Sequence, residues 1–212
     1  DVTNGVSCTN GEGRPFSVKL WRGALYLGVV CDAALDFNSA TPRIVADTNL
    51  SFTIRKYALT TSTWSNFFGP HPLNSVGRIQ KGAPQAGDNW ARPTYMAWNP
   101  WTSSYANTFD ANGTPDYSIR PQPMLSEIEF DRDGSMILAF RDRNGDLMGT
   151  FDSEAPDGSS TPFAIASGDI YRVCRTGTGY SASDYTFEGV AGCQPTPTPA
   201  HFSNTTDART QG

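Results

Sequence analysis

Two Gly-containing turns in the second half of the sequence carry oxygen-bearing side chains that could bind a divalent cation. Carboxylate and amide oxygens are the ligands that Ca²⁺ prefers in proteins, so calcium is the cofactor such a cluster would take. An EF-hand loop, however, needs Gly at its sixth position and Glu at its twelfth, and this chain has neither at that spacing. Ordinary turn formation by Asp and Asn is therefore the explanation we prefer. The five residues are Asp131, Asp133, Asp142, Asn144 and Asp146.

A second set of candidates is aromatic. Trp and Tyr interleaved with Asn and Ser fill a segment with little strand pattern, and exposed rings of this kind stack on sugar faces or anchor a protein partner. The simpler alternative, which we favour, is that these rings cover the core beneath a long loop. Binding becomes the better account if the rings are exposed. The candidate ligand-binding residues are Trp90, Tyr95, Trp98, Trp101 and Tyr105.

Catalytic chemistry finds little support in the sequence. The only histidines are His71, between two prolines, and His201, near the end of the chain. No G-x-S-x-G motif is present, so a Ser–His–Asp triad is unsupported. Glu127 and Glu129 share one strand face, which a solvated surface explains without a glycosidase carboxylate pair. We therefore expect a protein that is not an enzyme.

The four cysteines are best explained as two disulfides. Cys8, Cys31, Cys174 and Cys193 form no C-x-x-C pair, and with two histidines a zinc site has few ligands. Three pairings can be drawn, and we choose Cys8 with Cys31 and Cys174 with Cys193, each closing a short local loop. Four buried thiols are the alternative. Disulfides would place the chain in an oxidising, extracellular compartment.

Three N-glycosylation sequons would mark surface loops if the source glycosylates asparagine, although a chain rich in Asn, Ser and Thr also contains sequons by chance. They begin at Asn49, Asn112 and Asn204. The start at Asp1, without Met, fits a mature secreted chain and fits an excised segment equally well.

Composition narrows the classes of protein further. The 212 residues suffice for one domain with a tail. A formal net charge of −5 argues against a nucleic-acid partner, because phosphate binding needs clustered Lys and Arg. No apolar run approaches the roughly 18 residues of a membrane span. The Gly 20 and Pro 15 counts favour short strands joined by many turns.

Two segments that must position the candidate residues share one plan: proline, strand, tight turn, strand, loop, strand, short strand. Period-two alternation identifies the strands, and in the first of them it places Phe16, Val18 and Leu20 on one face, as a half-buried strand requires. Asp-Gly and Asn-Gly pairs predict hairpins after residues 130 and 141. The expected strands are 16–21, 24–31, 50–59 and 64–68, then 125–130, 135–141, 168–174 and 185–190.

Repeated four-stranded antiparallel units are the blades of a β-propeller. We therefore predict an all-β fold of blade-like units, propeller-like and incomplete, with a β-sandwich as the alternative. The β-rich domain would cover 1–193, with units at about 14–69 and 121–193 and an aromatic insertion at about 70–120. A Pro/Thr-rich linker and polar tail would follow at 194–212. Two units do not close a ring, so the chain is a piece of a longer protein, pairs its strand edges with other copies, or is a sandwich.

The segments 13–19, 25–31, 121–143 and 167–172 together resemble the propeller-like region of large bacterial secreted or surface proteins that carry Ig-like repeats of the SdrD B type. The resemblance covers about half of the chain, and residues 121–143 are its most specific part. It implies an extracellular location and a structural or adhesive role, with no catalytic residues. We therefore expect a non-catalytic extracellular module, self-assembling through strand edges or contacting surface glycans or proteins. A carbohydrate-binding or carbohydrate-processing propeller that uses the aromatic insertion is the alternative.

Overall fold

The computed structural model describes residues 5–37, 49–73, 79–80, 98–104, 117–118, 121–148, 163–164, 167–188 and 192–193. Strands dominate this part of the chain, and its helical segments are short. No helix in these ranges is long and apolar enough to cross a membrane. The strands are β1 Gly13–Trp21, β2 Ala24–Cys31, β3 Ser51–Ala58, β4 Thr63–Pro72, β5 Ile79–Gln80, β6 Tyr117–Ser118, β7 Pro123–Phe130, β8 Met136–Asp142, β9 Phe163–Ala164, β10 Ser167–Arg175 and β11 Tyr185–Phe187. The helical segments are η1 Ala34–Asp36, α1 Arg143–Met148 and η4 Ala182–Asp184.

Eight of these strands form two antiparallel sheets. Sheet A has the order β1-β2-β3-β4, and sheet B has the order β11-β10-β8-β7, with the short β5 also paired to β10. Each sheet is thus a meander in which strands that follow one another in the chain are neighbours, apart from the short strand inserted before β10. The all-β class and the two four-stranded antiparallel units predicted from the sequence are confirmed.

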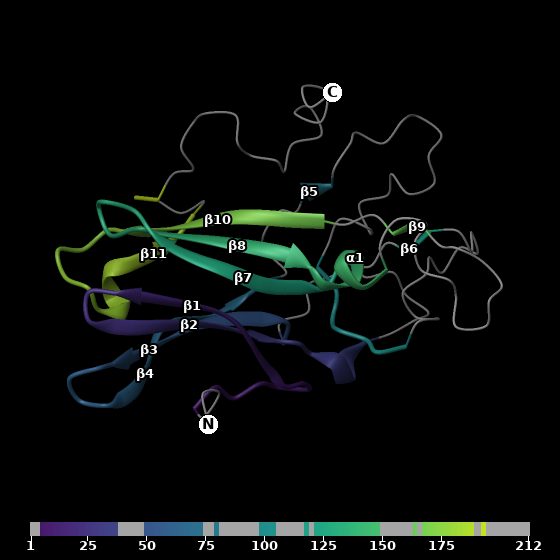
Figure 1. Ribbon diagram of the computed structural model, residues 1–212, viewed down its shortest axis with the longest axis horizontal. Coiled ribbons are helices and arrows are strands. Elements are labelled where there is room, and N and C mark those ends of the chain that lie inside the picture. Colours follow the sequence, from purple (N-terminus) through teal and green to yellow (C-terminus); the bar gives the residue numbers. More distant parts are fainter. Residues whose placement is uncertain are drawn as a thin grey trace, which may run out of the picture.

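The two sheets pack face to face as two layers (Figure 1). Their inner faces share one hydrophobic core, to which sheet A contributes Phe52 and Ile54 and sheet B contributes Leu125 and Leu138, all of them fully buried. Aromatic side chains bridge the layers: the ring centroids of Phe52 and Phe140 are 5.3 Å apart. Because burial of apolar area is the main favourable term in folding, this shared core is what holds the sheets together.

One glycine shows how closely the layers approach. Gly28 of β2 faces Leu125 of β7, and a Cβ atom at position 28 would lie 2.5 Å from the Leu125 Cδ2 and 2.3 Å from the Ser17 Oγ. Any larger side chain at position 28 would therefore push β7 away from sheet A. A glycine inside a strand weakens that strand, and here a close approach between sheets requires it.

The prediction for the face of β1 is wrong. Phe16, Val18 and Leu20 point away from the core and are 46%, 61% and 61% exposed. The opposite face of β1 meets sheet B instead, where Lys19 forms an ion pair with Glu129 and Trp21 stacks on Phe130 at a centroid distance of 4.0 Å. Alternation in an edge strand identifies two faces without saying which one is buried, and the neighbouring sheet decides.

The segment after β8 also differs from its prediction. Asn144-Gly145 was expected to form a hairpin turn, but Arg143–Met148 is the helix α1. The Asp142 carboxylate accepts a hydrogen bond from the backbone N–H of Asn144 at 2.9 Å, which is the geometry of an N-cap. A capping carboxylate at this position favours a helical turn over the reversal that the Asn-Gly pair suggested.

A buried aspartate at the end of the second strand makes the same hydrogen bonds in both sheets. In sheet B, the Asp142 carboxylate also accepts a hydrogen bond from the N–H of Gln122, just before β7. In sheet A, Asp32 follows β2 and accepts from the N–H of Glu12, just before β1, at 2.9 Å. It also accepts from the N–H of Ala34, where η1 begins. Each aspartate therefore ties the start of a first strand to the helical turn that follows the second strand.

A bulge at the corresponding place supports the same equivalence between the sheets. The pairing register shifts between Pro15 and Ser17 in β1 and between Leu125 and Glu127 in β7. Sheets A and B are therefore two versions of one structural unit. A propeller ring needs at least about four such sheets, and the described ranges supply two of them plus the parallel pair β6–β9, so the propeller stays a prediction.

Candidate functional site

The aromatic candidates are divided between the core and the part of the chain outside the described residues. Trp98 and Trp101 are 4% and 8% exposed. The Trp98 indole N–H donates to the Tyr171 hydroxyl at 3.1 Å, and the Trp101 indole N–H donates to the Pro123 carbonyl at 3.0 Å. Rings buried and hydrogen-bonded in this way offer no face to a sugar. Trp90, Tyr95 and Tyr105 lie outside the described residues, as do most of the insertion and the tail 194–212.

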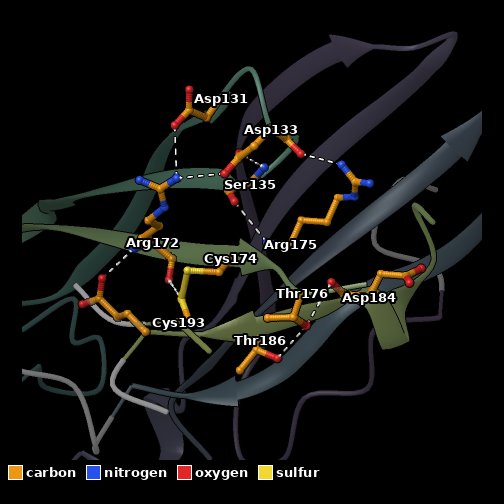
Figure 2. The surroundings of a disulfide bond; sticks show 11 residues. Asp131, Asp133, Ser135, Arg172, Cys174, Arg175, Thr176, Asp184, Thr186 and Cys193 are labelled. Carbon is orange, nitrogen blue, oxygen red and sulfur yellow. Dashed lines mark hydrogen bonds and ion pairs between the residues drawn. A yellow bond between two sulfur atoms is a disulfide. The ribbon is translucent and has the colours of Figure 1, made fainter. Parts of the chain in front are cut away.

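The acidic candidates lie at opposite ends of β8, a strand of seven residues. Asp131 and Asp133 occupy the turn before this strand, where the Arg172 guanidinium lies 3.1 Å and 3.2 Å from their carboxylates (Figure 2). At the other end, Asp146 forms an ion pair with Arg141 at 2.6 Å. The remaining two, Asp142 and Asn144, are buried at the start of α1.

These five residues therefore do not form one oxygen cluster. Seven strand residues span about 20 Å, which is several times the diameter of a coordination sphere. No group of three or more His, Cys, Asp and Glu side chains that could hold a metal occurs within the described ranges. Calcium is accordingly not carried into the proposals below.

Two disulfides tie the ends of the sheets to their neighbouring segments. Cys8 is bonded to Cys31 at the end of β2, and Cys174 of β10 is bonded to Cys193 (Figure 2). These are the two pairs chosen from the sequence. Each bond anchors a segment outside the sheets to a strand, because Cys8 precedes β1 and Cys193 follows β11.

The sequon that the structure describes is half-buried. The Asn49 amide N–H donates to the Asp36 carboxylate at 2.8 Å, so the nitrogen that would carry a glycan is engaged in the folded chain. Asn112 and Asn204 lie outside the described residues.

His71 is half-buried at the border of the aromatic core. Its ring stacks on Phe187 at a centroid distance of 4.0 Å, and its Nδ1 lies 3.1 Å from the Pro72 carbonyl. Burial lowers the pKa of His71 below its ordinary value of 6.5. A side chain packed in this way serves the interior of the protein.

Three exposed apolar side chains form what we call the outer stripe: Phe16, Val18 and Leu20 of β1. Leu20 is paired with the half-buried Leu25 of β2, so the apolar surface extends to one side chain of the neighbouring strand, whereas Leu27, opposite Val18, is buried. The stripe itself carries no charge, and the nearest charged side chain of β1, Arg14, lies at its end over the Trp101 ring, which Phe16 also contacts. An uncharged apolar surface of this kind is typical of a protein contact site.

Two of the edge strands, β1 and β7, carry features that oppose pairing with another chain. Pro15 and a bulge interrupt β1, and its Lys19 points inward to Glu129. Pro123 begins β7, which also has a bulge. Prolines, bulges and inward-pointing charges are the usual protections of edge strands. We infer that contacts through these edges are disfavoured.

A cluster of rings and guanidinium groups, not anticipated from the sequence, lies where three connections meet. We call it the arginine–aromatic cluster: Trp21, Arg22, Phe130, Arg175 and Tyr180. The Arg22 and Arg175 guanidinium carbons lie 4.3 Å and 4.4 Å from the centre of the Tyr180 ring. Trp21 meets the Tyr180 ring edge-on at 5.1 Å. The rings and the two arginines are partly exposed, Arg22 most of all.

Hydrogen bonds hold one half of this cluster in place. The Arg175 guanidinium donates to the carbonyls of Gly179, Thr178 and Asp133 at 2.9, 3.0 and 2.6 Å. Burial raises the pKa of Tyr185 to about 12, and its hydroxyl donates to the Gly134 carbonyl at 3.0 Å. The β7–β8 turn and the β10–β11 loop are thereby fixed to one another.

No local sequence signal announces this cluster. Its members come from the ends of β1, β7 and β10 and from the loop 176–184, and only the packing of the two sheets brings them together. The nearest indication is Trp21-Arg22-Gly23, an aromatic residue and a cation in a tight turn.

Comparison of the chain with protein-family models, with curated proteins and with solved structures finds no match in any of the three. The resemblance to the propeller-like region of bacterial surface proteins thus stays a prediction. Function has to be argued from the geometry of this chain alone.

Proposed function

We propose that this chain is a non-catalytic structural or adhesive module of an extracellular protein, and that it contacts a second copy of itself through the outer stripe. The observation that carries the proposal is the exposure of Val18 and Leu20, each 61% exposed on a strand of a fully packed double sheet. Side chains of this kind gain free energy only when a partner covers them.

An extracellular location is supported by the two disulfides, because such bonds persist in oxidising compartments. They also suit a scaffold that must keep its shape outside the cell. The half-buried His71 ring is stacked on Phe187 and tilted against Phe52, which favours a packing role for this side chain.

A second copy fits the stripe because the surface is uncharged. Two identical patches related by a two-fold axis meet without like-charge repulsion, whereas a charged partner would lose hydration there without gaining an ion pair. Burying the exposed part of each Val18 or Leu20 contributes about 1–2 kcal/mol. Because three partly exposed side chains supply less than the roughly 800 Å² per partner of a standard interface, we expect a weak dimer.

Sedimentation velocity over a wide concentration range tests the proposal. We expect the wild-type chain to associate reversibly, and the double variant Val18→Lys, Leu20→Lys to stay monomeric. Ile170→Lys is the matched control, because Ile170 is 55% exposed on the outer face of sheet B. Circular dichroism establishes that both variants keep the fold. A wild-type chain that stays monomeric at millimolar concentration, or equal loss in both variants, would refute the proposal.

A further inference from the structure

Two apolar side chains of β2 are buried without belonging to the core between the sheets. Leu27 and Val29 are 9% and 0% exposed, whereas the core that the two sheets share contains their neighbours Tyr26 and Val30. Because successive residues of a strand point to opposite faces, Leu27 and Val29 point to the outer face of sheet A. Sheet B therefore does not cover them, and another segment must.

The segment before β1 lies over this outer face. Cys8 is bonded to Cys31 at the end of β2, and the Gly5 carbonyl accepts a hydrogen bond from the Arg55 Nη1 at 3.1 Å. The chain runs here along the side of sheet A that faces away from sheet B (Figure 1). We call residues 5–8 the strap, because both of its ends are attached to the sheet.

The two attachment points place the strap over the buried pair. Arg55 of β3 is paired with Leu27, and Cys31 lies four residues further along β2, which corresponds to about 13 Å. Val29 lies halfway between them. Residues 5–8 reach about 10 Å when extended, and the side chains at the two attachments cover the remaining distance. The strap therefore covers the half of the outer face that ends at Cys31 and leaves the outer stripe open.

The residues that follow the strap are held independently of the disulfide. The Asn10 carbonyl accepts a hydrogen bond from the Leu35 N–H at 2.9 Å, and the Glu12 carbonyl accepts one from the Asp32 N–H at 3.1 Å. The Asn10 side chain also donates to the Asp36 carboxylate at 2.8 Å. Opening the disulfide leaves these hydrogen bonds in place, so only the strap loses its covalent attachment to the sheet.

We propose that the strap limits self-association and that reduction of the Cys8–Cys31 disulfide releases it. This regulation rests on the proposed contact through the outer stripe. Val18 of the stripe is paired with Leu27, so release joins the stripe to Leu27 and Val29 in one larger apolar surface. A second copy of the chain covers this surface, because apolar side chains exposed in this way gain free energy when they are buried.

The charged residue at the end of the strap does not interrupt the enlarged surface. The Arg55 guanidinium also donates to the Asn66 Oδ1 at 2.6 Å and lies 6.0 Å from the centre of the Trp64 ring. Both partners belong to β4, whereas the apolar surface lies on β1 and β2. Two copies related by a two-fold axis can therefore meet there without like-charge repulsion.

The release is a two-electron reduction by a dithiol. Cys8 is partly exposed, whereas Cys31 is 3% exposed, so a thiolate of the reductant attacks the Cys8 sulfur and displaces the Cys31 thiolate. The second thiolate of the reductant then attacks the mixed disulfide and displaces the Cys8 thiolate. The reductant ends as a disulfide, and each cysteine takes up one of its two protons to end as a thiol.

Sedimentation velocity of the double variant Cys8→Ser, Cys31→Ser tests the proposal. We expect it to associate about 10-fold more tightly than the wild-type chain, or more, because the contact then buries two further apolar side chains. The matched control is Cys174→Ser, Cys193→Ser, which opens a loop of similar length, with a sequence separation of 19 against 23, and should keep the wild-type affinity. The wild-type chain reduced with dithiothreitol should reach the affinity of the first variant.

The outcomes separate the strap from the outer stripe. If the wild-type chain associates and Cys8→Ser, Cys31→Ser associates no more tightly, the strap is overturned and the stripe stands. If the wild-type chain stays monomeric and this variant associates, the stripe alone is refuted as the contact and the strap is supported. Absence of association in both overturns both. Equal tightening in the two double variants overturns the strap, and so does unfolding of Cys8→Ser, Cys31→Ser in circular dichroism, because the strap is then not released by itself.

Discussion

Replacing Asp142 by alanine should destabilise the protein severely, although the residue is not part of any proposed contact surface. Its side chain is 2% exposed and accepts backbone hydrogen bonds from Gln122 and Asn144, each at 2.9 Å. A hydrogen bond to a charged group contributes about 1.5–3 kcal/mol, and a buried N–H left without a partner costs free energy as well. We therefore expect a loss of about 3–6 kcal/mol, a large part of the roughly 5–15 kcal/mol that stabilises a typical domain.

Urea unfolding followed by circular dichroism, with the disulfides intact, measures this loss as a change in the midpoint and in the extrapolated free energy of unfolding. Asp142→Asn keeps a carbonyl oxygen that can accept the same hydrogen bonds, so it should lose only about 1 kcal/mol. Asp131→Ala serves as the matched control. The Asp131 carboxylate forms an exposed ion pair with Arg172, and pairs of this kind contribute about 0–1 kcal/mol.

The equivalent residue of sheet A extends the test. The buried Asp32 carboxylate accepts from the N–H groups of Glu12 and Ala34 and from the Arg14 Nε at 2.7 Å. Asp32→Ala should therefore destabilise at least as much as Asp142→Ala. If either alanine variant unfolded at the same urea concentration as Asp131→Ala, the hydrogen bonds from Asp32 and Asp142 to the strand and the helical turn would not stabilise the fold as we argue. The equivalent positions of the two aspartates in sheets A and B would then make no contribution to stability.

Two further predictions concern the core and its covalent anchor. Because burial lowers the pKa of His71 below 6.5, the unfolded chain binds a proton more readily than the folded chain, and the stability of the fold should decrease as the pH drops from about 7 to 5. His71→Phe should reduce this pH dependence in thermal unfolding measured across the same range. An unchanged pH dependence would show that His71 is not the group responsible. Replacing Cys174 and Cys193 together by Ser opens a loop with a sequence separation of 19 and should lower the free energy of unfolding, measured in urea, by about 3 kcal/mol. An unchanged midpoint of the urea transition would show that the disulfide does not restrain the unfolded chain.

The sequence predicted the positions of the eight main strands because apolar side chains recur at every second residue in most of them, although β4 continues to Pro72 and β11 already ends at Phe187. Alternation of this kind is a local property, so all eight main strands were found from it. The buried face of β1 was predicted wrongly, because the exposed side chains Phe16, Val18 and Leu20 alternate in the same way as a buried face would. Which face meets a second sheet depends on the position of β7, and that information is not local.

Helix α1 was missed for a related reason. Asn144-Gly145 suits a tight reversal by its own conformational preferences, but the preceding Asp142 supplies a capping carboxylate. The Asp142 carboxylate is held in its capping position by a hydrogen bond from the N–H of Gln122, which directly precedes β7, the other strand of the β7–β8 hairpin. Likewise, the arginine–aromatic cluster joins Trp21 and Tyr180, which are far apart along the chain and meet only after both sheets have formed.

The outer face of sheet B explains why association should stop at a dimer. A longer stack would require the outer stripe of one copy to pack on this face of the next. Register pairs Glu127 with Ala139 and Glu129 with Ile137, then Ile137 with Arg172 on the next strand, so charges flank the apolar centre on both sides. Covering these charges costs desolvation free energy, and the uncharged outer stripe forms no ion pair that would compensate for it. Two stripes facing each other avoid this cost, and a closed pair is therefore favoured over a filament.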